Sequence, residues 1–160
     1  MSFRANDIKF YLNNAQEYAN KYSTCSKVAV GCAIVPAHGV AIYGANRSMD
    51  YDCKKAGCQR IALYGENSKE HRLPADCRAV HSEVDAIASA ARLGYALQYS
   101  TAFITRYPCE ACARALVDAG ISEVYFGRKT DISEQTEQIF SYNGVAVHHV
   151  SSWDYEDTEV

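Results

Sequence analysis

The first part of the chain has the spacing of an amphipathic helix followed by two short strands. Between residues 5 and 22, apolar side chains recur every three or four positions, which predicts a helix with one buried stripe. The stripe consists of Ile8, Tyr11, Leu12, Ala15, Tyr18, Ala19 and Tyr22. Two β-rich runs, 28–35 and 40–43, flank the sequence Pro-Ala-His-Gly. Proline and glycine favour a tight turn there, so we predict a β-hairpin.

The second half of the chain alternates between helical and strand patterns. An alanine-rich helix is predicted over 81–93 and ends at Gly94. Its buried face is predicted to carry Val84, Ile87, Ala88 and Ala91. The later elements are a strand over 101–105, a helix over 109–119, a strand over 124–126, a helix over 132–140 and a strand over 145–150. This alternation predicts an α/β layered domain with some parallel pairing.

Residues 47–79 interrupt the alternation, because they are polar and show no sustained periodicity. The stretch nevertheless contains Cys53, Cys58, His71 and Cys77. A structureless loop of about thirty residues is uncommon in a compact domain, so bound metal is a candidate for ordering it. We therefore predict a single domain over 1–150 with a cysteine-rich insertion at 47–79, followed by an acidic tail over 151–160.

Composition narrows the class of protein. The chain has 160 residues, 48% hydrophobic and 22% charged, which is typical of a globular protein and not of a disordered, collagen-like or membrane-spanning one. Its seven cysteines form an odd count, and its N-terminus lacks the apolar core of a signal peptide. Both features argue against a secreted disulfide scaffold. We expect a cytoplasmic protein, or one of the host cytoplasm if viral, whose thiols bind metal or do chemistry.

Negative charge is concentrated at the end of the chain. Four of the last seven residues are acidic, namely Asp154, Glu156, Asp157 and Glu159. The formal net charge is −3, so the remainder of the chain carries +1. This distribution provides no broad basic surface for a polynucleotide and favours a small-molecule partner. No membrane partner is expected.

Two motifs concentrate groups that bind zinc or move protons. His81-Ser82-Glu83 begins one predicted helix, and Pro108-Cys109-Glu110-Ala111-Cys112 begins the next. One imidazole and two thiolates provide three ligands of tetrahedral zinc and leave a fourth position for water, as in catalytic sites. Helix N-termini also stabilise thiolates. Glu83 follows closely enough to exchange a proton with that water and a substrate.

Two other interpretations of these residues are open. Cys109 and Cys112 alone have the spacing of a redox-active pair. With His81 they could also form a closed structural zinc site, but that interpretation leaves Glu83 without a role.

His-x-Glu paired with Pro-Cys-x-x-Cys is the signature of zinc deaminases. The chain resembles the cytidine deaminase superfamily, and within it the deoxycytidylate deaminases, in the segments VGCAIV, YGAN, CRAVHSEVDAI and TRYPCEACARALVDAGISEVYFG. The resemblance extends from the first helix to about Val150. It implies a three-layer α/β/α cytidine-deaminase-like fold with a central mixed five-stranded sheet. It also implies hydrolytic removal of the 4-amino group of dCMP, which gives dUMP and ammonia in pyrimidine nucleotide metabolism.

The resemblance also implies residue roles. The implied ligands of a catalytic zinc are His81, Cys109 and Cys112, and Glu83 is the implied proton shuttle. The implied substrate contacts are Asn46 against the sugar and the Ser82 backbone N–H near the base carbonyl. Tyr107 is a further candidate for lining the base pocket, with core packing as the alternative. Relatives often form homo-oligomers and some respond to dCTP and dTTP, so an oligomer, these regulators and Mg²⁺ with an allosteric nucleotide are expectations.

The insertion suggests a second, structural zinc. Cys53, Cys58, His71 and Cys77 offer four ligands for it. By resemblance to phage-type deoxycytidylate deaminases, Cys25 replaces one of the insertion cysteines. The alternative is a set of free cysteines on a loop.

The insertion also contains Arg60, Arg72 and Arg78, which are candidates for binding phosphate. Glu66, Glu70 and Asp76 make a solvated face of mixed charge the alternative.

One position departs from the family pattern. Relatives often carry Glu-x-Asn after the histidine, whereas this chain has Glu83-Val84-Asp85. A carboxylate beside a substrate phosphate would repel it. Either Asp85 faces elsewhere, a cation intervenes, or the substrate is not a simple 5′-monophosphate.

The leading functional hypothesis is a dCMP deaminase. The alternative is a tRNA adenosine deaminase or another nucleoside or nucleotide deaminase of the superfamily, suggested by Asn46-Arg47 and the strand at 124–127. The long insertion and the acidic tail argue against RNA. A third hypothesis is a non-catalytic zinc module that binds a nucleotide, and the presence of Glu83 argues against it.

Overall fold

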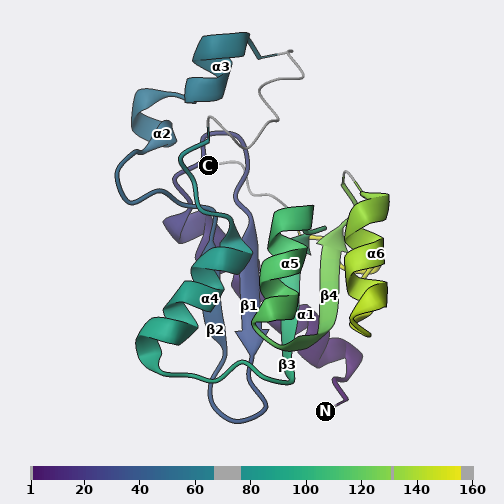
Figure 1. Ribbon diagram of the computed structural model, residues 1–160. Helices are drawn as coiled ribbons and strands as arrows, with labels where there is room; N and C mark the ends of the chain where they lie inside the picture. The colour runs from purple at the N-terminus through teal and green to yellow at the C-terminus, as the bar shows by residue number, and fades with distance from the viewer. Residues whose placement is uncertain (1, 67–76, 131, 156–160) are drawn as a thin grey trace.

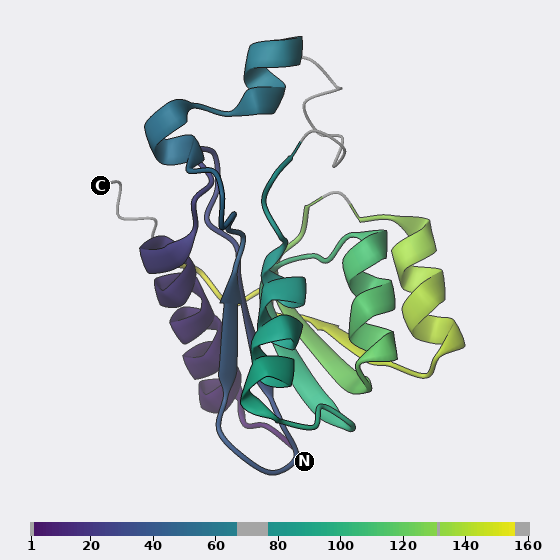
Figure 2. The ribbon, with the colours of Figure 1, turned by 60° about the vertical axis from the view of Figure 1, so that its left-hand side comes forward.

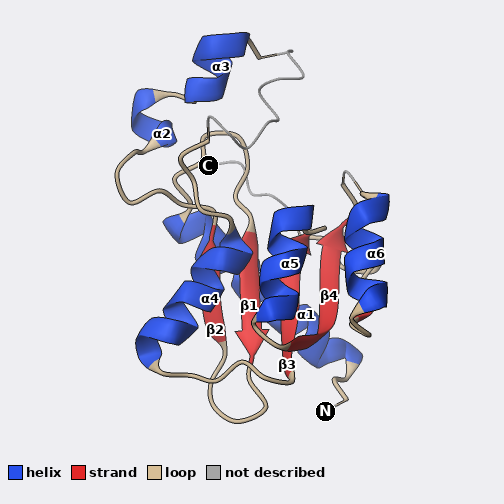
Figure 3. Cartoon of the chain, in the orientation of Figure 1, coloured by secondary structure: helices blue, strands red, loops and turns tan. Residues whose placement is uncertain are grey.

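The fold is a five-stranded mixed sheet covered by helices on both faces (Figures 1 and 3). It is seen in a computed structural model that describes residues 2–66, 77–130 and 132–155. In chain order the elements are α1 (Ala5–Tyr22), β1 (Gly31–Val35), β2 (Ile42–Ala45), α2 (Cys53–Ala56), α3 (Gln59–Tyr64), α4 (Ser82–Leu93), β3 (Ser100–Arg106), α5 (Glu110–Asp118), β4 (Ile121–Arg128), α6 (Glu134–Tyr142) and β5 (Ala146–His149). In the part of the chain described, no helix is long and apolar enough to cross a membrane.

The strand order is β2-β1-β3-β4-β5. β1 pairs antiparallel with β2 and β3, whereas β3, β4 and β5 run parallel. Figure 2 shows α1 on one face of the sheet and α4, α5 and α6 on the other. The three-layer α/β/α fold with a mixed five-stranded sheet is therefore confirmed.

The central strand β3 contributes to both layers of the core. Ala102 and Ile104 pack into the cluster beneath α4, α5 and α6. Phe103 points to the opposite face and packs against Leu12 and Ala15 of α1. Because side chains alternate across a strand, one buried strand holds the two helical layers together.

Helix α4 lies very close to β2 at its N-terminal end. A Cβ atom at Gly44 would collide with the carbonyl oxygen of Ser82 and the backbone nitrogen of Ala86. Only glycine leaves room for this approach, which places the first turn of α4 against the end of β2.

The buried face predicted for α4 was wrong at three of its four positions, whereas Ile87 does pack against the core. Val84 is 37% exposed, and Ala88 and Ala91 are also exposed. The face that lies against the sheet instead carries Ser82, Glu83, Asp85, Ala86, Ser89 and Ala90. Close packing favours small side chains there, and the two acidic groups are turned inward with them.

The predicted hairpin was correct in kind and displaced in its boundaries. β1 begins at Gly31, after a segment in which Asn46 bonds Val28 through its side chain and Val30 through both its side chain and its backbone N–H. β2 covers 42–45 in place of the predicted 40–43.

The insertion contains two short helices, α2 and α3, which the sequence pattern did not reveal. Its ends are joined by paired backbone hydrogen bonds between Arg47 and Val80, with N···O distances of 3.1 and 2.9 Å. Residues 48–79 therefore leave and re-enter the domain at one place, beside the start of α4.

Candidate metal centre and active site

The three predicted zinc ligands come together at the N-terminal ends of α4 and α5. His81 is the N-cap residue of α4, and Cys109 is the N-cap residue of α5. The Sγ atoms of Cys109 and Cys112 lie 3.5 and 3.3 Å from His81 Nδ1. All three ligand atoms lie within 4.8 Å of one another, and no other group of three His, Cys, Asp or Glu residues meets this spacing in the described ranges.

The electrostatics of the cluster suit a soft cation. A hydrogen bond with Cys112 lowers the pKa of the Cys109 thiol to about 3. The same hydrogen bond raises the pKa of Cys112. Contact with Cys109 raises the pKa of His81. One imidazole nitrogen and two sulfurs are a donor set that zinc prefers, and binding it would displace the remaining protons. The three residues therefore fit a zinc ion.

Glu83 lies beside this cluster in the first turn of α4. Its side chain is 4% exposed, and burial raises its pKa above the ordinary range of a carboxyl group. The Ser82 hydroxyl donates a hydrogen bond to Glu83 Oε2 at 3.0 Å, which fixes the carboxyl group. Both residues line a cavity of about 520 Å³ together with His81 and Cys109. The cavity is of a size that accepts a small molecule.

Asn46 and Tyr107 also line this cavity, as the sequence predicted for substrate contacts. The Asn46 amide is engaged with the protein: its Oδ1 accepts from Ser23 Oγ at 2.7 Å and from the Val30 N–H at 2.8 Å. The Tyr107 ring packs edge-on against Phe126. Both residues therefore have packing roles, and their contacts with a substrate stay predictions.

Three basic side chains line the same cavity, and we call them the cationic wall: Lys27, Arg60 and Arg106. The Nε of Arg106 donates to Thr130 Oγ1 at 2.6 Å. Arg60 is predicted from the sequence as a candidate for binding phosphate, whereas Lys27 and Arg106 are not. Arg106 lies within the TRYPC motif, next to Tyr107, and this adjacency is the signal that identifies it.

Asp85, where the family pattern differs, is neutralised by Arg47. The Arg47 Nη2 lies 2.9 Å from Asp85 Oδ1, and its Nε lies 3.0 Å from both carboxylate oxygens. The Ala45 N–H also donates to Asp85 at 3.0 Å. Asp85 is not among the residues that line the cavity. A cation therefore intervenes, and the carboxylate faces the end of β2.

Four thiols lie in the region where the insertion meets the loop before β1, and they do not have the close spacing of the His81, Cys109 and Cys112 cluster. Burial raises the pKa of Cys53, and the neighbouring thiols of Cys25, Cys58 and Cys77 raise it further. The Cys25 sulfur accepts a hydrogen bond from the Lys27 N–H at 3.4 Å. All seven cysteines lie in described ranges and are free thiols. His71 and Arg72 lie outside the described residues.

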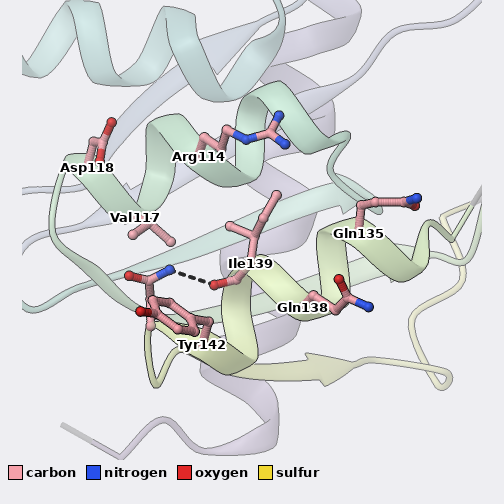
Figure 4. A pocket seen from close by; sticks show the side chains of 8 residues that line it. Arg114, Val117, Asp118, Gln135, Gln138, Ile139 and Tyr142 are labelled. Carbon is pink, nitrogen blue, oxygen red and sulfur yellow. Dashed lines mark hydrogen bonds between the residues drawn. The ribbon is translucent and has the colours of Figure 1, made fainter.

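A second cavity, of about 550 Å³, lies between α5 and α6 (Figure 4). It is lined by Arg114, Val117, Asp118, Gln135, Gln138, Ile139, Tyr142 and Asn143. The dashed line in Figure 4 is the Asn143 side chain donating to the Ile139 carbonyl at 2.8 Å. Neither zinc-binding motif reaches it, so the chemistry belongs to the cavity at the metal centre.

Proteins similar in sequence to this chain include deaminases. The ComE operon protein 2 of Bacillus subtilis (strain 168) is 28% identical over 130 residues, which are 80% of this chain and 63% of that protein. The deoxycytidylate deaminase of Saccharomyces cerevisiae is 28% identical over 143 residues, which are 88% of this chain and 44% of that protein. The chain thus spans less than two thirds of either relative.

Solved structures establish the fold independently. The dCMP deaminase of cyanophage S-TIM5, solved with dCMP and dUMP, has a TM-score of 0.71 at 19% sequence identity. The aligned region covers 93% of this chain and 100% of the cyanophage chain. A structure from a study of tRNA:A34 deaminases has a TM-score of 0.54 at 18% identity, with 88% and 96% of the two chains covered.

The family itself follows from the sequence match. Residues 5–128 match the model of the cytidine and deoxycytidylate deaminase zinc-binding region. That range includes the His-x-Glu and Pro-Cys-x-x-Cys motifs whose side chains meet at the metal centre. Since the match covers most of the chain, this protein belongs to the zinc-dependent cytidine and deoxycytidylate deaminase family.

Proposed function

We propose that the protein deaminates dCMP to dUMP and ammonia by hydrolysis. The observation that carries the proposal is that one cavity is lined by zinc ligands, by a buried carboxyl group and by the cationic wall. The zinc ligands and Glu83 suit attack on a ring carbon, and the basic side chains suit a phosphate on the same molecule. A nucleoside has no negative charge for these side chains to bind.

Glu83 is the residue that moves protons in this proposal. Bound zinc would act as a Lewis acid that lowers the pKa of water. Glu83 takes the proton that the attacking water releases and transfers it to N3 of the cytosine ring. It then takes the proton of the hydroxyl group now bonded to C4 and delivers it to the 4-amino group, so that the C4–N bond breaks, ammonia leaves and C4 becomes the carbonyl of uracil. Because burial raises the pKa of Glu83, its carboxyl group can hold the proton between these transfers.

The test is ammonia release by the zinc-loaded protein from four substrates: dCMP, CMP, deoxycytidine and a tRNA hairpin that contains adenosine. We expect the highest kcat/KM with dCMP. Turnover of the hairpin without turnover of dCMP would establish the tRNA deaminase alternative in its place. Binding of dUMP without turnover of any substrate would support the non-catalytic module.

We also propose a second, structural zinc held by Cys25, Cys53, Cys58 and Cys77. The proposal is supported by the electrostatic influence of Cys25, Cys58 and Cys77 on the Cys53 thiol, in a part of the chain with little apolar core of its own. His71, named from the sequence as a ligand, lies outside the described residues, and Cys25 is proposed as the fourth ligand because its thiol acts on Cys53.

Metal analysis tests the second site. We expect two zinc ions per chain in the wild type, one in Cys53→Ser and two in His71→Ala. One zinc per fully active chain refutes the second site, and loss of an ion in His71→Ala returns the histidine to the ligand set.

Other properties are proposed from the family resemblance alone. They are a homo-oligomer, a cytoplasmic location, regulation by dCTP and dTTP, and Mg²⁺ bound with such a regulator. Light scattering during gel filtration, with and without each nucleotide and Mg²⁺, tests the oligomer. Assays at subsaturating dCMP test the regulators.

A further inference from the structure

One member of the cationic wall comes from the cysteine-rich insertion. Arg60 occupies the second position of α3, and its side chain lines the cavity together with His81, Glu83 and Cys109. Its guanidinium is close enough to His81 to interact with it electrostatically. The insertion therefore brings a positive charge to the metal centre from a part of the chain outside the α/β core.

The start of α3 is held in place by its neighbours. The Arg78 Nε donates to Gln59 Oε1 at 3.0 Å, and the Arg78 Nη1 lies 3.3 Å from an Asp50 carboxylate oxygen. The Arg78 guanidinium also stacks over the Tyr51 ring, 5.2 Å from its centroid. The Tyr51 hydroxyl in turn donates to the Gly57 carbonyl at 3.0 Å, just before α3. These contacts fix the residue next to Arg60.

Arg60 also connects the cavity with the thiol cluster. Burial alone would raise the pKa of the Cys58 thiol, but the backbone N–H groups of Ile61 and Arg60 and the Arg60 guanidinium together lower it. Arg60 thus interacts with Cys58 and also lines the cavity.

The two arginines of the insertion that the structure describes, Arg60 and Arg78, differ in their surroundings. Arg78 is exposed and bound to Asp50 and Gln59, and it does not line the cavity. Arg60 does line it. An arginine presents a planar fork of N–H donors that matches two phosphate oxygens, which the flexible and exposed Lys27 cannot do.

The carboxylate at the position that departs from the family pattern does not oppose a phosphate in this cavity. Asp85 is neutralised by Arg47 and lies outside the cavity lining. Asp85 therefore does not offset the positive charge of the cationic wall.

We propose that Arg60 binds the 5′-phosphate of the substrate and is the residue by which the enzyme selects nucleotides over nucleosides. The inference rests on the proposed deaminase function. The insertion then has a defined role, because it carries the group that recognises the substrate phosphate, while α4 and α5 carry the groups that act on the base.

The test compares Arg60→Gln and Arg60→Lys with the wild type on dCMP and on deoxycytidine. We expect Arg60→Gln to lower kcat/KM for dCMP by about 10- to 100-fold, mainly through KM, because a charged hydrogen-bond partner is lost. Deoxycytidine turnover should change less than about twofold, since it has no phosphate for Arg60 to bind. Arg60→Lys should recover part of the loss, because it keeps the charge without the fork.

The matched control is Arg114→Gln on α5. Arg114 is a surface arginine, 3.5 Å from Glu110, and does not line the metal-centre cavity. The substitution removes the same charge from the protein, and we expect it to leave both substrates unaffected. Zinc content and circular dichroism of each variant establish that the fold is retained.

Calorimetric measurement of dUMP and deoxyuridine binding tests phosphate recognition by Arg60 separately from deaminase activity. Arg60→Gln should weaken dUMP alone. An equal loss for both ligands, or an unchanged preference for the phosphate, would overturn the role of Arg60. A wild type that binds dUMP but deaminates nothing would overturn the enzymatic function and leave the Arg60 inference to be decided by binding.

Discussion

Two carboxylates in the first turns of α4 show how position decides chemistry. Glu83 and Asp85 are both buried, at 4% and 7% exposure. Asp85 is bound by the Arg47 guanidinium and the Ala45 N–H, so its charge is matched within the fold. Glu83 faces the cavity, and burial raises its pKa. An ion-paired carboxylate stabilises the fold, whereas a carboxyl group whose pKa is raised by burial is suited to accept and release a proton.

Replacing Glu83 with Gln should abolish deamination while zinc remains bound. The amide keeps the shape of the carboxyl group but cannot accept a proton, and general acid–base catalysis contributes about 10²- to 10⁴-fold. Ammonia release and zinc analysis of the same preparation are the measurements. Retained turnover would refute the proton-shuttle role.

Replacing Asp85 with Asn should affect stability and not substrate binding. It leaves the half-buried Arg47 guanidinium without its counter-charge, which should lower the free energy of unfolding by about 1–3 kcal/mol. Urea denaturation measures this loss. The KM for dCMP should be unchanged, and a lower KM in the variant would mean that Asp85 opposes the phosphate after all.

At the scale of elements, the geometry of the metal centre depends on how closely α4 approaches β2. The approach passes through Gly44, whose missing side chain admits the backbone of Ser82 and Ala86. His81 and Glu83 flank Ser82, so the same contact sets the position of both functional side chains. A substitution in β2 should therefore displace the residues of the metal centre even though it replaces none of the zinc ligands.

Gly44→Ala tests this dependence. The added Cβ meets backbone atoms, which cannot rotate away, so we expect a loss of about 3 kcal/mol and weaker zinc binding. Thermal unfolding and a zinc competition assay report the two effects. The control is Gly144→Ala, where φ is +68° and nothing lies within 4 Å of the new Cβ. A Gly44 variant no worse than this control would show that the approach is not tight.

The elements that the sequence predicted well are those whose local signals agree. His81 and Cys109 were placed at helix starts, and the structure has them there as N-cap residues. The buried face of α4 was missed because hydrophobic periodicity cannot indicate that acidic side chains turn inward. Helices α2 and α3 were missed because they have no buried residue and hence no apolar stripe. Lys27 and Arg106 were missed because the cavity is assembled from segments far apart in the sequence.

At the scale of the whole molecule, the last described residues fasten α1 to the sheet. Trp153 is 8% exposed, and its ring lies where a side chain at Gly127 would be. Its indole N–H donates to Asn13 Oδ1 at 2.8 Å, and the Arg128 guanidinium lies over its ring at 5.4 Å. Arg128 also donates to Gln16 of α1 at 3.1 Å. The start of the predicted acidic tail thus belongs to the packed layer on this face.

Trp153→Ala should therefore destabilise the whole domain, by about 3–5 kcal/mol, because it leaves a large cavity between α1 and β4. Differential scanning calorimetry gives the change. Tyr142→Ala is the matched control, since Tyr142 is 92% exposed and its loss should cost less than about 0.5 kcal/mol. Equal effects of the two substitutions would mean that Trp153 does not hold α1 in place.

The backbone bridge between Arg47 and Val80 makes residues 48–79 a separable part of the chain. Because the two ends of residues 48–79 meet there, the segment can be exchanged for a different one without moving its anchor points or His81. A variant in which a short turn between Arg47 and Val80 replaces residues 48–79 would lack Arg60 and retain the residues of the metal centre. Such an exchange would change the residues that the insertion contributes to the cavity and leave His81, Cys109 and Cys112 in place.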